Sequence, residues 1–329
     1  VGEGFIVDSS RLMEKGRLIE IRPHTRFAHF PPHTHNYVEL VYMCSGSTTH
    51  ILNNRDVIEL KAGDILFLNQ HAVQEILPAG EDDIAVNFII LPGFFDKVIA
   101  MMGGMGRSFD GSYAEYALLP AHHVFKVETD LDWAELAAVP ETYLTAWGSL
   151  FDSLHLEKDD TLLIRGATCA LGYVAMDMAK ALGCKVIATT HRENKLDLLK
   201  DADVAILDDG DLRHKGLGVD KALDLVGPKN LIDTMFSVKV GGIVCNTGIL
   251  GGVYTLNDFD PIKDIPNGVY LTGYLSNYPD QRTVDSIFDF INQHDLHPRL
   301  AKKFDFKDIR DACIALDGGK INGKIVVTL

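Results

Sequence analysis

Residues 161–172 read Thr161-Leu162-Leu163-Ile164-Arg165-Gly166-Ala167-Thr168-Cys169-Ala170-Leu171-Gly172, and this stretch decides the fold of the larger part of the chain. An apolar run of strand length is followed by a turn of small residues, after which a helical pattern of apolar residues begins. A phosphate-binding turn needs small residues where Ala167, Cys169 and Gly172 stand, because its backbone approaches a pyrophosphate closely. The N–H groups at the start of the helix then face the anion. The stretch predicts a dinucleotide-binding turn; the alternative is an ordinary strand–helix turn in an α/β protein that binds no nucleotide.

Strands and helices alternate from this stretch to about residue 275. We predict strands at residues 161–165, 185–190, 204–207, 221–226, 243–247 and 269–274, and helices at 171–182, 195–201 and 231–238. The strand segments 162–164 and 186–188 are apolar on both faces, as in a parallel sheet covered by helices on both sides. Residues 151–275 are therefore predicted to form a doubly wound Rossmann domain. Residues 276–329 are predicted to add helices at 282–294 and 307–316 and a last strand at 325–329.

The end of the second strand favours one cofactor over another. Sites for NAD usually have an acidic residue there, which holds the ribose hydroxyls, whereas this chain has Thr190. Arg192 and Lys195 follow, and such cations suit the 2′-phosphate of a phosphorylated ribose. The segment therefore favours NADPH over NADH. Two alternatives stay open: Glu193 could hold a ribose hydroxyl, and the two cations could be the solvated start of a helix.

The first 96 residues follow a different pattern. Short strand candidates lie at residues 5–7, 18–22, 37–44, 48–52, 57–60, 64–68 and 84–91, with glycine- or asparagine-containing turns between most of them. Regularly spaced short strands without intervening helices predict a small all-β barrel.

Composition excludes some classes of partner. The chain has 329 residues and a formal charge of −15, which argues against nucleic acid or an anionic membrane as the main partner. Its apolar stretches are too short and too interrupted to span a bilayer. The five cysteines are odd in number and far apart, so neither a disulfide framework nor a cysteine metal site is expected. We predict a cytoplasmic protein that acts on small molecules.

An ordered set of segments downstream of residue 97 resembles the medium-chain dehydrogenase/reductases, specifically their zinc-independent, quinone oxidoreductase-like branch. The segments are Gly111-Ser112-Tyr113-Ala114-Glu115-Tyr116, Glu135-Leu136-Ala137-Ala138-Val139-Pro140, Asp224-Leu225-Val226-Gly227, Thr247-Gly248-Ile249-Leu250-Gly251-Gly252 and Gly323-Lys324-Ile325-Val326-Val327. The resemblance implies that residues 97–150 are the remnant of a GroES-like substrate domain with a linking helix, to which residues 276–329 return. It also implies a homodimer that forms through residues 269–274.

The resemblance also implies which residues bind the cofactor. The pyrophosphate would lie at Gly166, Ala167, Thr168, Cys169, Leu171 and Gly172, and the adenosine phosphate at Thr190, Arg192 and Lys195. The nicotinamide side would be lined by Val226, Gly227, Thr247, Gly248, Ile249 and Leu250, with Thr145 behind the ring. The zinc ligands of related enzymes are absent from this sequence, so hydride transfer without zinc is expected, and no catalytic residue is identified.

Cys169 allows a further hypothesis, which concerns the reactivity of its thiol. A thiol at a helix N-terminus can have a lowered pKa and be reactive. The alternative is that Cys169 is simply a small residue that fits the turn.

A histidine-rich segment in the first 96 residues matches the first motif of cupin barrels. It reads His33-Thr34-His35-Asn36-Tyr37-Val38-Glu39 and is followed by Gly46. Together with Phe30-Pro31-Pro32, Gly63-Asp64 and Leu68-Asn69-Gln70-His71-Ala72, it makes residues 15–95 resemble the sensor cupin of AraC-type regulators, which binds small molecules. No helix-turn-helix follows, so the DNA-binding half of such a regulator is not expected here.

Three residues of the segment are candidate ligands for a divalent metal. His33, His35 and Glu39 would face one side of a strand, and imidazole and carboxylate groups bind several transition metals. The second cupin motif places Gln74 where another histidine is usual; His71 stands three residues earlier and would need a shifted turn to reach the site. The alternative is that these polar residues line a ligand cavity.

Three functions follow from these features. The leading hypothesis is an NADPH-dependent oxidoreductase that transfers hydride to a carbonyl, a quinone or an activated alkene. The alternatives are a non-catalytic sensor fusion that binds a small molecule, and a metal-dependent cupin enzyme. A fusion near Asp96 explains both halves of the chain better than one divergent family does.

Overall fold

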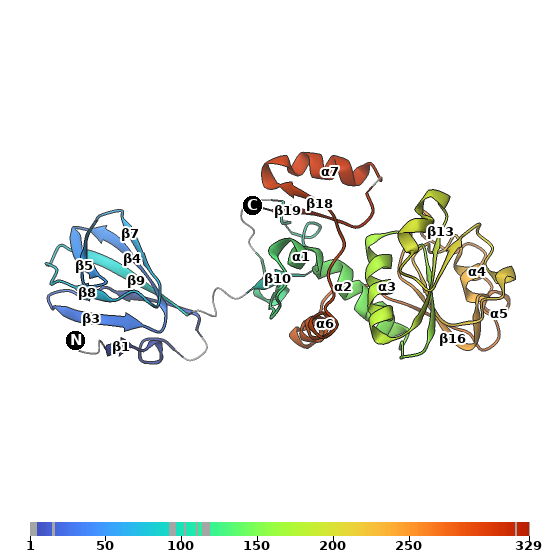
Figure 1. Cartoon of the computed structure of the whole chain (residues 1–329), viewed down its shortest axis with the longest axis horizontal. Helices are drawn as coiled ribbons and strands as arrows, with labels where there is room; N and C mark the ends of the chain where they lie inside the picture. The colour runs from blue at the N-terminus through green and yellow to red at the C-terminus, as the bar shows by residue number, and fades with distance from the viewer. Residues whose placement is uncertain are drawn as a thin grey trace. The chain divides into compact units, whose positions relative to one another are not determined.

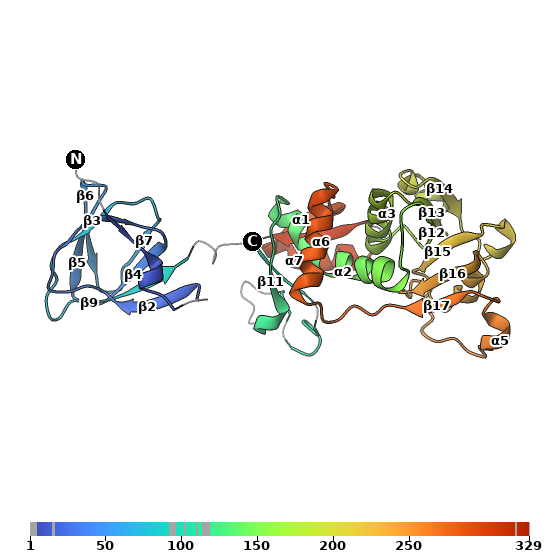
Figure 2. The same ribbon diagram turned by 90° about the horizontal axis from the view of Figure 1, so that it is seen from below.

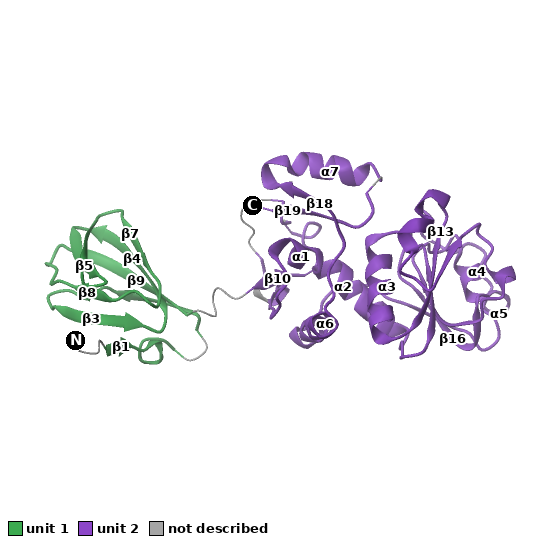
Figure 3. Cartoon of the chain, viewed as in Figure 1, with its two compact units in different colours: residues 1–96 green, residues 97–329 purple. Residues whose placement is uncertain are grey.

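The computed structural model describes residues 5–14, 17–91, 97–101, 103–109, 111–113, 119–319 and 321–328. Figures 1 and 2 show the ribbon from two directions. The chain forms two compact units, residues 1–96 and residues 97–329, which are coloured separately in Figure 3. Part of the predicted GroES-like segment (Ala114–Tyr116) and the predicted fusion point near Asp96 lie outside the described residues.

The first unit consists of two β-sheets. One has five strands in the order β1 (Phe5–Val7), β3 (Phe30–His35), β8 (Gln74–Ile76), β5 (Ser47–Leu52) and β6 (Asp56–Lys61). The other has four strands in the order β2 (Ile19–Pro23), β9 (Ile84–Ile90), β4 (Val38–Ser45) and β7 (Ile65–Leu68). The buried apolar cluster of the first unit consists of Val41, Met43, Leu60 and Ala85. In the described ranges no strand pairing joins the two sheets, so the predicted all-β character is confirmed but a closed barrel is not shown.

The second unit is built on a six-stranded parallel sheet. Its order is β14 (Val204–Leu207), β13 (Lys185–Thr190), β12 (Thr161–Arg165), β15 (Val219–Asp224), β16 (Val238–Asn246) and β17 (Tyr270–Gly273). In chain order, the strands begin in the middle of the sheet at β12 and continue outward through β13 and β14. The chain then crosses to the other side of β12, where β15, β16 and β17 follow. This order confirms the predicted doubly wound fold. Its switch point, where ligands bind in such sheets, lies between β12 and β15.

Helices cover both faces of the parallel sheet. Helix α3 (Ala170–Leu182) covers one face and α4 (Leu231–Met235) the other, as Figure 1 shows. Leu162, Leu163 and Ile164 of β12 are inaccessible to solvent, which explains why that strand is apolar on both faces.

The rest of the second unit packs beside this sheet. It contains α1 (Trp133–Ala138), α2 (Pro140–Trp147), the π-helix Gly148–Ser153, α5 (Pro261–Asp264), α6 (Gln281–Gln293), α7 (Ile309–Asp317) and two small sheets, β10 (Val98–Ala100) with β11 (Val124–Lys126) and β18 (Leu300–Asp305) with β19 (Lys324–Thr328). Short 3₁₀ helices lie at Ala121–His123, Glu193–Leu199, Arg213–Lys215 and Phe306–Asp308, and the first unit has one at Ser9–Arg11. None of the helices in the described part of the chain is long and apolar enough to cross a bilayer.

Some predicted elements differ from the observed ones. Strands β12, β13 and β14 occupy their predicted residues, whereas the helix predicted at 195–201 is a 3₁₀ helix at Glu193–Leu199. The predicted strands did not include β8, β11 or β18, and β3 was anticipated only through the placement of His33 and His35 on a strand. Two prolines near the start of β3 hide its strand pattern, and β8 has only three residues.

A close backbone contact fixes the start of α3. A β-carbon on Gly172 would lie 2.3 Å from the carbonyl oxygen of Ala167, which is far inside van der Waals contact. Gly166 has a φ of +81°, a conformation that favours glycine. Only small residues therefore allow the helix to begin directly above the end of β12.

We predict that Gly172→Ala destabilises the second unit. Alanine normally stabilises a helix relative to glycine, but here its methyl group meets backbone that cannot move aside. We expect the free energy of unfolding to fall by about 2 kcal/mol or more. Gly318→Ala is the control, because its β-carbon would make ordinary contacts of 3.4–3.5 Å. Equal melting temperatures for the Gly172→Ala and Gly318→Ala proteins would show that the contact is not tight.

Candidate functional site

A cavity of about 440 Å³ lies at the carboxyl ends of the central parallel strands. Its wall is formed by Gly166, Thr168, Cys169, Thr190, His191, Arg192, Lys195, Asp208, Asp209, Gly210, Val226, Lys229, Asn230, Leu250, Gly251 and Gly319. The wall therefore includes the residues that follow β12, β13, β14 and β15. This is the switch-point position at which doubly wound sheets bind nucleotides.

The turn after β12 forms one side of the cavity. Cys169 is the N-cap of α3, and its sulfur accepts a hydrogen bond from the backbone N–H of Gly172 at 3.3 Å. Burial raises the pKa of the Cys169 thiol, partly offset by hydrogen bonds from Gly172 and Leu171. The hypothesis of a lowered pKa was therefore wrong, because loss of solvent outweighs the helix N-terminus. The alternative, a small residue that fits the turn, agrees with this structure.

The end of β13 gives the cavity a positively charged side. Thr190 is buried, and its hydroxyl lies 3.1 Å from that of Thr168 and accepts a hydrogen bond from the N–H of Arg192 at 3.3 Å. The Lys195 ammonium donates to Asn322 at 2.6 Å. Burial lowers the pKa of Lys195, and the neighbouring charge of Arg192 lowers it further. Arg192 and Lys195 both face the cavity, whereas Glu193 is not part of its wall.

Only some of the remaining predicted residues line the cavity. Val226 and Leu250 line the cavity. Gly227 and Gly248 are not part of the wall but lie close together, since a β-carbon on Gly227 would lie 2.5 Å from the Gly248 carbonyl oxygen. The other residues that are not part of this wall are Thr145, Ala167, Leu171, Gly172, Thr247 and Ile249.

Two of these residues belong to a chain of hydroxyl groups. The Thr145 hydroxyl donates to the Glu141 carbonyl at 2.7 Å and lies 3.0 Å from the Ser276 hydroxyl. The Ser149 hydroxyl donates to the Thr145 carbonyl at 2.7 Å and lies 2.9 Å from the Thr247 hydroxyl. The structure thus brings Thr145 and Thr247 near each other through Ser149, a residue with no functional signal at the sequence level.

Several wall residues were missed at the sequence level. They are His191, Asp208, Asp209, Gly210, Lys229, Asn230, Gly251 and Gly319. Asp208 directly follows the predicted strand 204–207, so the rule that ligands bind at the carboxyl ends of parallel strands could have identified it. Gly319 is far away in sequence and gave no comparable signal.

The first unit has a cavity of its own, of about 350 Å³. It is lined by Val7, Leu12, Arg22, Pro23, Thr25, Phe30, His33, His35, Tyr37, Glu39, Ile76, Asn87 and Ile89. The rings of His33 and His35 are 4.8 Å apart, and Nε2 of His35 lies 3.7 Å from Oε2 of Glu39. The structure therefore brings the three predicted metal ligands together.

These side chains also contact protein neighbours. Nδ1 of His33 lies 2.8 Å from the Pro31 carbonyl, and Asn87 donates to Oε1 of Glu39 at 2.7 Å. Burial lowers the pKa of His35 to about 4 and raises the pKa of Glu39 to about 7. No group of three His, Cys, Asp or Glu residues among those described could hold a metal ion. The open alternative, a polar wall of a ligand cavity, agrees with the lining of this cavity.

The second cupin motif does not contribute a ligand either. Gln74 is buried and hydrogen-bonds to His50 at 2.8 Å rather than lining the cavity. His71 is exposed and lies 3.4 Å from the Gln70 amide. The suggestion that a shifted turn brings His71 to the site was therefore wrong.

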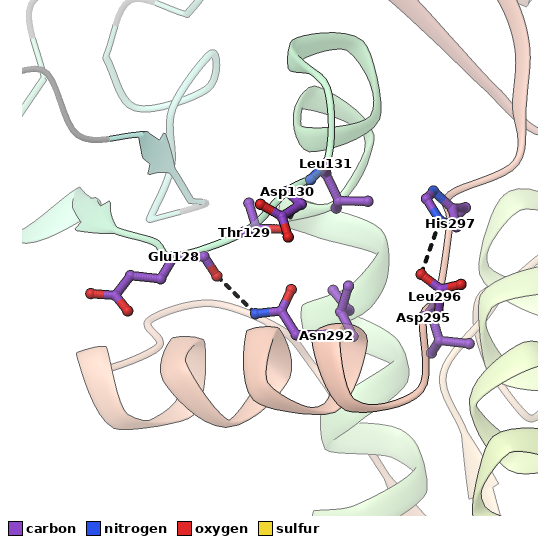
Figure 4. A pocket seen from close by; sticks show the side chains of 9 residues that line it. Glu128, Thr129, Asp130, Leu131, Asn292, Asp295, Leu296 and His297 are labelled. Carbon is purple, nitrogen blue, oxygen red and sulfur yellow. Dashed lines mark hydrogen bonds and ion pairs between the residues drawn. The ribbon is translucent and has the colours of Figure 1, made fainter.

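A third cavity, of about 380 Å³, lies beside the end of α6 (Figure 4). Asn292 donates to the Glu128 carbonyl at 2.9 Å across it, and His297 pairs with Asp295 at 3.4 Å and with Glu135 at 2.7 Å. Its acidic residues, Glu128, Asp130 and Asp295, are exposed, so this hollow gives no sign of a specific ligand.

Two protein families match the chain. The model of the zinc-binding dehydrogenase family matches residues 200–327, and that of the AraC-like ligand binding domain matches residues 18–104. An alcohol dehydrogenase of Geobacillus stearothermophilus is 29% identical over 232 residues, which cover 68% of this chain and 66% of that protein. A quinone oxidoreductase of Pongo abelii is 30% identical over 177 residues, which cover 47% of this chain and 54% of that protein. The chain thus spans about half to two thirds of the length of these relatives.

Solved structures share the fold. A quinone oxidoreductase from Pseudomonas syringae pv. Tomato DC3000 has a TM-score of 0.61 at 22% identity, covering 71% of this chain and 75% of that one. A mycobacterial protein in complex with NADPH has a TM-score of 0.58 at 23% identity, covering 73% of this chain and 79% of that one. Together these comparisons confirm both resemblances that the sequence shows.

We predict that Cys169 is a slow thiol that a bound dinucleotide protects. Its raised pKa leaves little thiolate at neutral pH, so iodoacetamide should modify the exposed Cys44 first. Mass spectrometry of the alkylated peptides measures both rates. NADPH should slow the reaction of Cys169 and leave Cys44 unchanged. A Cys169 rate that is the same with and without NADPH would contradict its place in the cofactor site.

Proposed function

We propose that this chain, which joins part of a medium-chain, zinc-binding-type dehydrogenase to an AraC-like ligand-binding domain, is an NADPH-dependent oxidoreductase. The observation that carries the proposal is the switch-point cavity with Arg192 and Lys195 on its wall and no acidic residue at the end of β13. Cations at this position suit a ribose 2′-phosphate, whereas an acidic residue would suit free ribose hydroxyls.

The reaction is proposed to be hydride transfer to a carbonyl, a quinone or an activated alkene. NADPH supplies the hydride when it is bound, and the protein supplies binding, orientation and exclusion of water. The turn 166–172 would hold the pyrophosphate with backbone N–H groups. Thr145, Ser149 and Thr247 would orient polar groups on the nicotinamide side through their linked hydroxyls. Zinc is not part of the proposal, because its usual ligand set is missing from the sequence.

The first unit is proposed to bind a small polar molecule in its own cavity. Oε2 of Glu39 and Nδ1 of His35 are buried without a hydrogen-bond partner in the described part of the chain. Buried polar groups normally have partners, so a ligand or water would complete these two. This binding function accompanies the proposed oxidoreductase, and neither a non-catalytic chain nor a metal-dependent cupin is favoured.

A homodimer through β17 is also proposed. β17 is the last strand of the parallel sheet, so one of its edges has no partner strand among the described residues. Tyr270 on this strand is 63% exposed, and Leu275 just after it is 87% exposed. An exposed edge with apolar side chains is a template for pairing with another strand.

Thermal shift tests the cofactor directly. We expect NADPH to raise the melting temperature of the second unit more than NADH does at equal concentration, since ligands stabilise the state that binds them. Arg192→Ala or Lys195→Ala should weaken NADPH binding by about tenfold, because hydrogen bonds to charged groups are strong. The control is Lys200→Ala, an exposed lysine outside the cavity wall.

Oxidation of NADPH in the presence of quinones, enals or ketones then tests turnover. Consumption that depends on one of these acceptors supports the oxidoreductase. Equal stabilisation by NADH and NADPH would contradict the cofactor assignment, and tight NADPH binding without turnover would contradict the catalytic one.

The dimer is tested by light scattering. We expect a dimer for the unaltered protein and a shift to monomer for Tyr270→Lys, because a lysine on an edge strand opposes pairing. The control, Ile314→Lys, adds the same charge at an exposed apolar position on α7 and should leave the dimer intact. A monomeric unaltered protein at micromolar concentration would refute this arrangement.

A further inference from the structure

Arg165, the last residue of β12, is a buried cation directly behind the switch-point cavity. Its side chain has no exposed surface. Nε donates to Oδ2 of Asp208 at 2.8 Å, and Nη2 donates to Oδ1 at 2.9 Å. This two-pronged geometry is the strongest form of an arginine–carboxylate pair. Asp208 also accepts the N–H of Gly210 at 2.9 Å, and both residues are part of the cavity wall.

Arg165 also reaches the opposite side of the switch point. Nη1 donates to the carbonyl of Asn230 at 3.0 Å and to the hydroxyl of Thr234 at 3.0 Å, and it pairs with Asp233 at 2.7 Å. Asn230 lines the cavity, whereas Asp233 does not. One guanidinium therefore connects the wall after β14 to the wall after β15.

Opposing effects act on the charge of Arg165. Burial alone would lower its pKa, but its carboxylate partners, with Asp208 foremost, more than offset this and raise it. Arg165 therefore stays charged and can neutralise a carboxylate inside the protein.

The charges on the cavity wall show what this pairing does. The two acidic wall residues are each paired with a cation: Asp208 with Arg165, and Asp209 with Lys215 at 3.2 Å. By contrast, the wall cations Arg192, Lys195 and Lys229 form no ion pair within the described ranges. The cavity therefore presents unpaired positive charge and neutralised negative charge.

We propose that Arg165 is a positioning residue that sets the preference for the phosphorylated dinucleotide without touching it. By pairing with Asp208, it removes a negative charge that would oppose the ribose 2′-phosphate and fixes the Gly210 turn in the wall. The inference rests on the proposed NADPH site. It adds Arg165, which lies outside that site, as a residue on which the selectivity of the site for NADPH depends.

Calorimetric titrations with NADPH and with NADH test the inference. The proteins are the unaltered chain, Arg165→Met, Arg165→Met/Asp208→Asn and Arg165→Met/Asp233→Asn. Arg165→Met should weaken NADPH binding by about tenfold and NADH binding much less, because an unpaired like charge across a binding site costs affinity. Adding Asp208→Asn should restore the NADPH preference, since the unpaired charge is gone. Asp233→Asn is the matched control and should not restore it, because Asp233 does not line the cavity.

The outcomes separate the inference from the function on which it rests. If the unaltered chain binds neither nucleotide, or both equally, the proposed function fails. If it prefers NADPH and the preference survives Arg165→Met, or if both second substitutions restore it equally, Arg165 is only a structural residue and the inference is overturned. If Arg165→Met does not fold, the NADPH preference of the Asp208→Asn variant alone tests the inference. That variant leaves the charge of Arg165 less neutralised, so the NADPH preference should rise by about threefold, and an unchanged preference overturns the inference.

Discussion

The contact between Gly172 and the backbone of Ala167 is the constraint on which the candidate site depends. Because a β-carbon at Gly172 would lie 2.3 Å from a carbonyl oxygen, α3 can begin directly above the end of β12 only with glycine there. That position places the first N–H groups of the helix at the switch point of the parallel sheet. The walls after β13, β14 and β15 then meet the turn at one cavity.

In our account, the charges on the cavity wall determine which dinucleotide this geometry favours. Arg192 and Lys195 lie on the cavity wall without carboxylate partners among the described residues, while Asp208 on the same wall is paired with the buried Arg165. A doubly wound sheet alone does not discriminate between dinucleotides, since function depends on the side chains at the site rather than on the fold. In our account, the arrangement of free cations and paired carboxylates favours the phosphorylated form.

The sequence allowed much of the second unit to be predicted and less of the first. Strands buried on both faces and the glycine-containing turn are local signals, so β12, β13 and the start of α3 could be located from them. The role of Arg165 could not, because its partners Asp208 and Asp233 come from distant segments that only the tertiary fold brings together. For the first unit, His33, His35 and Glu39 were correctly predicted to share a cavity. Their contacts with Pro31 and Asn87 are not revealed by strand alternation.

A crystal structure of the chain with NADPH tests the central claim most directly. Our account predicts that the pyrophosphate lies against the backbone of residues 166–172 and that the 2′-phosphate contacts Arg192 and Lys195. A 2′-phosphate that points into solvent, or a dinucleotide bound away from this turn, would contradict it.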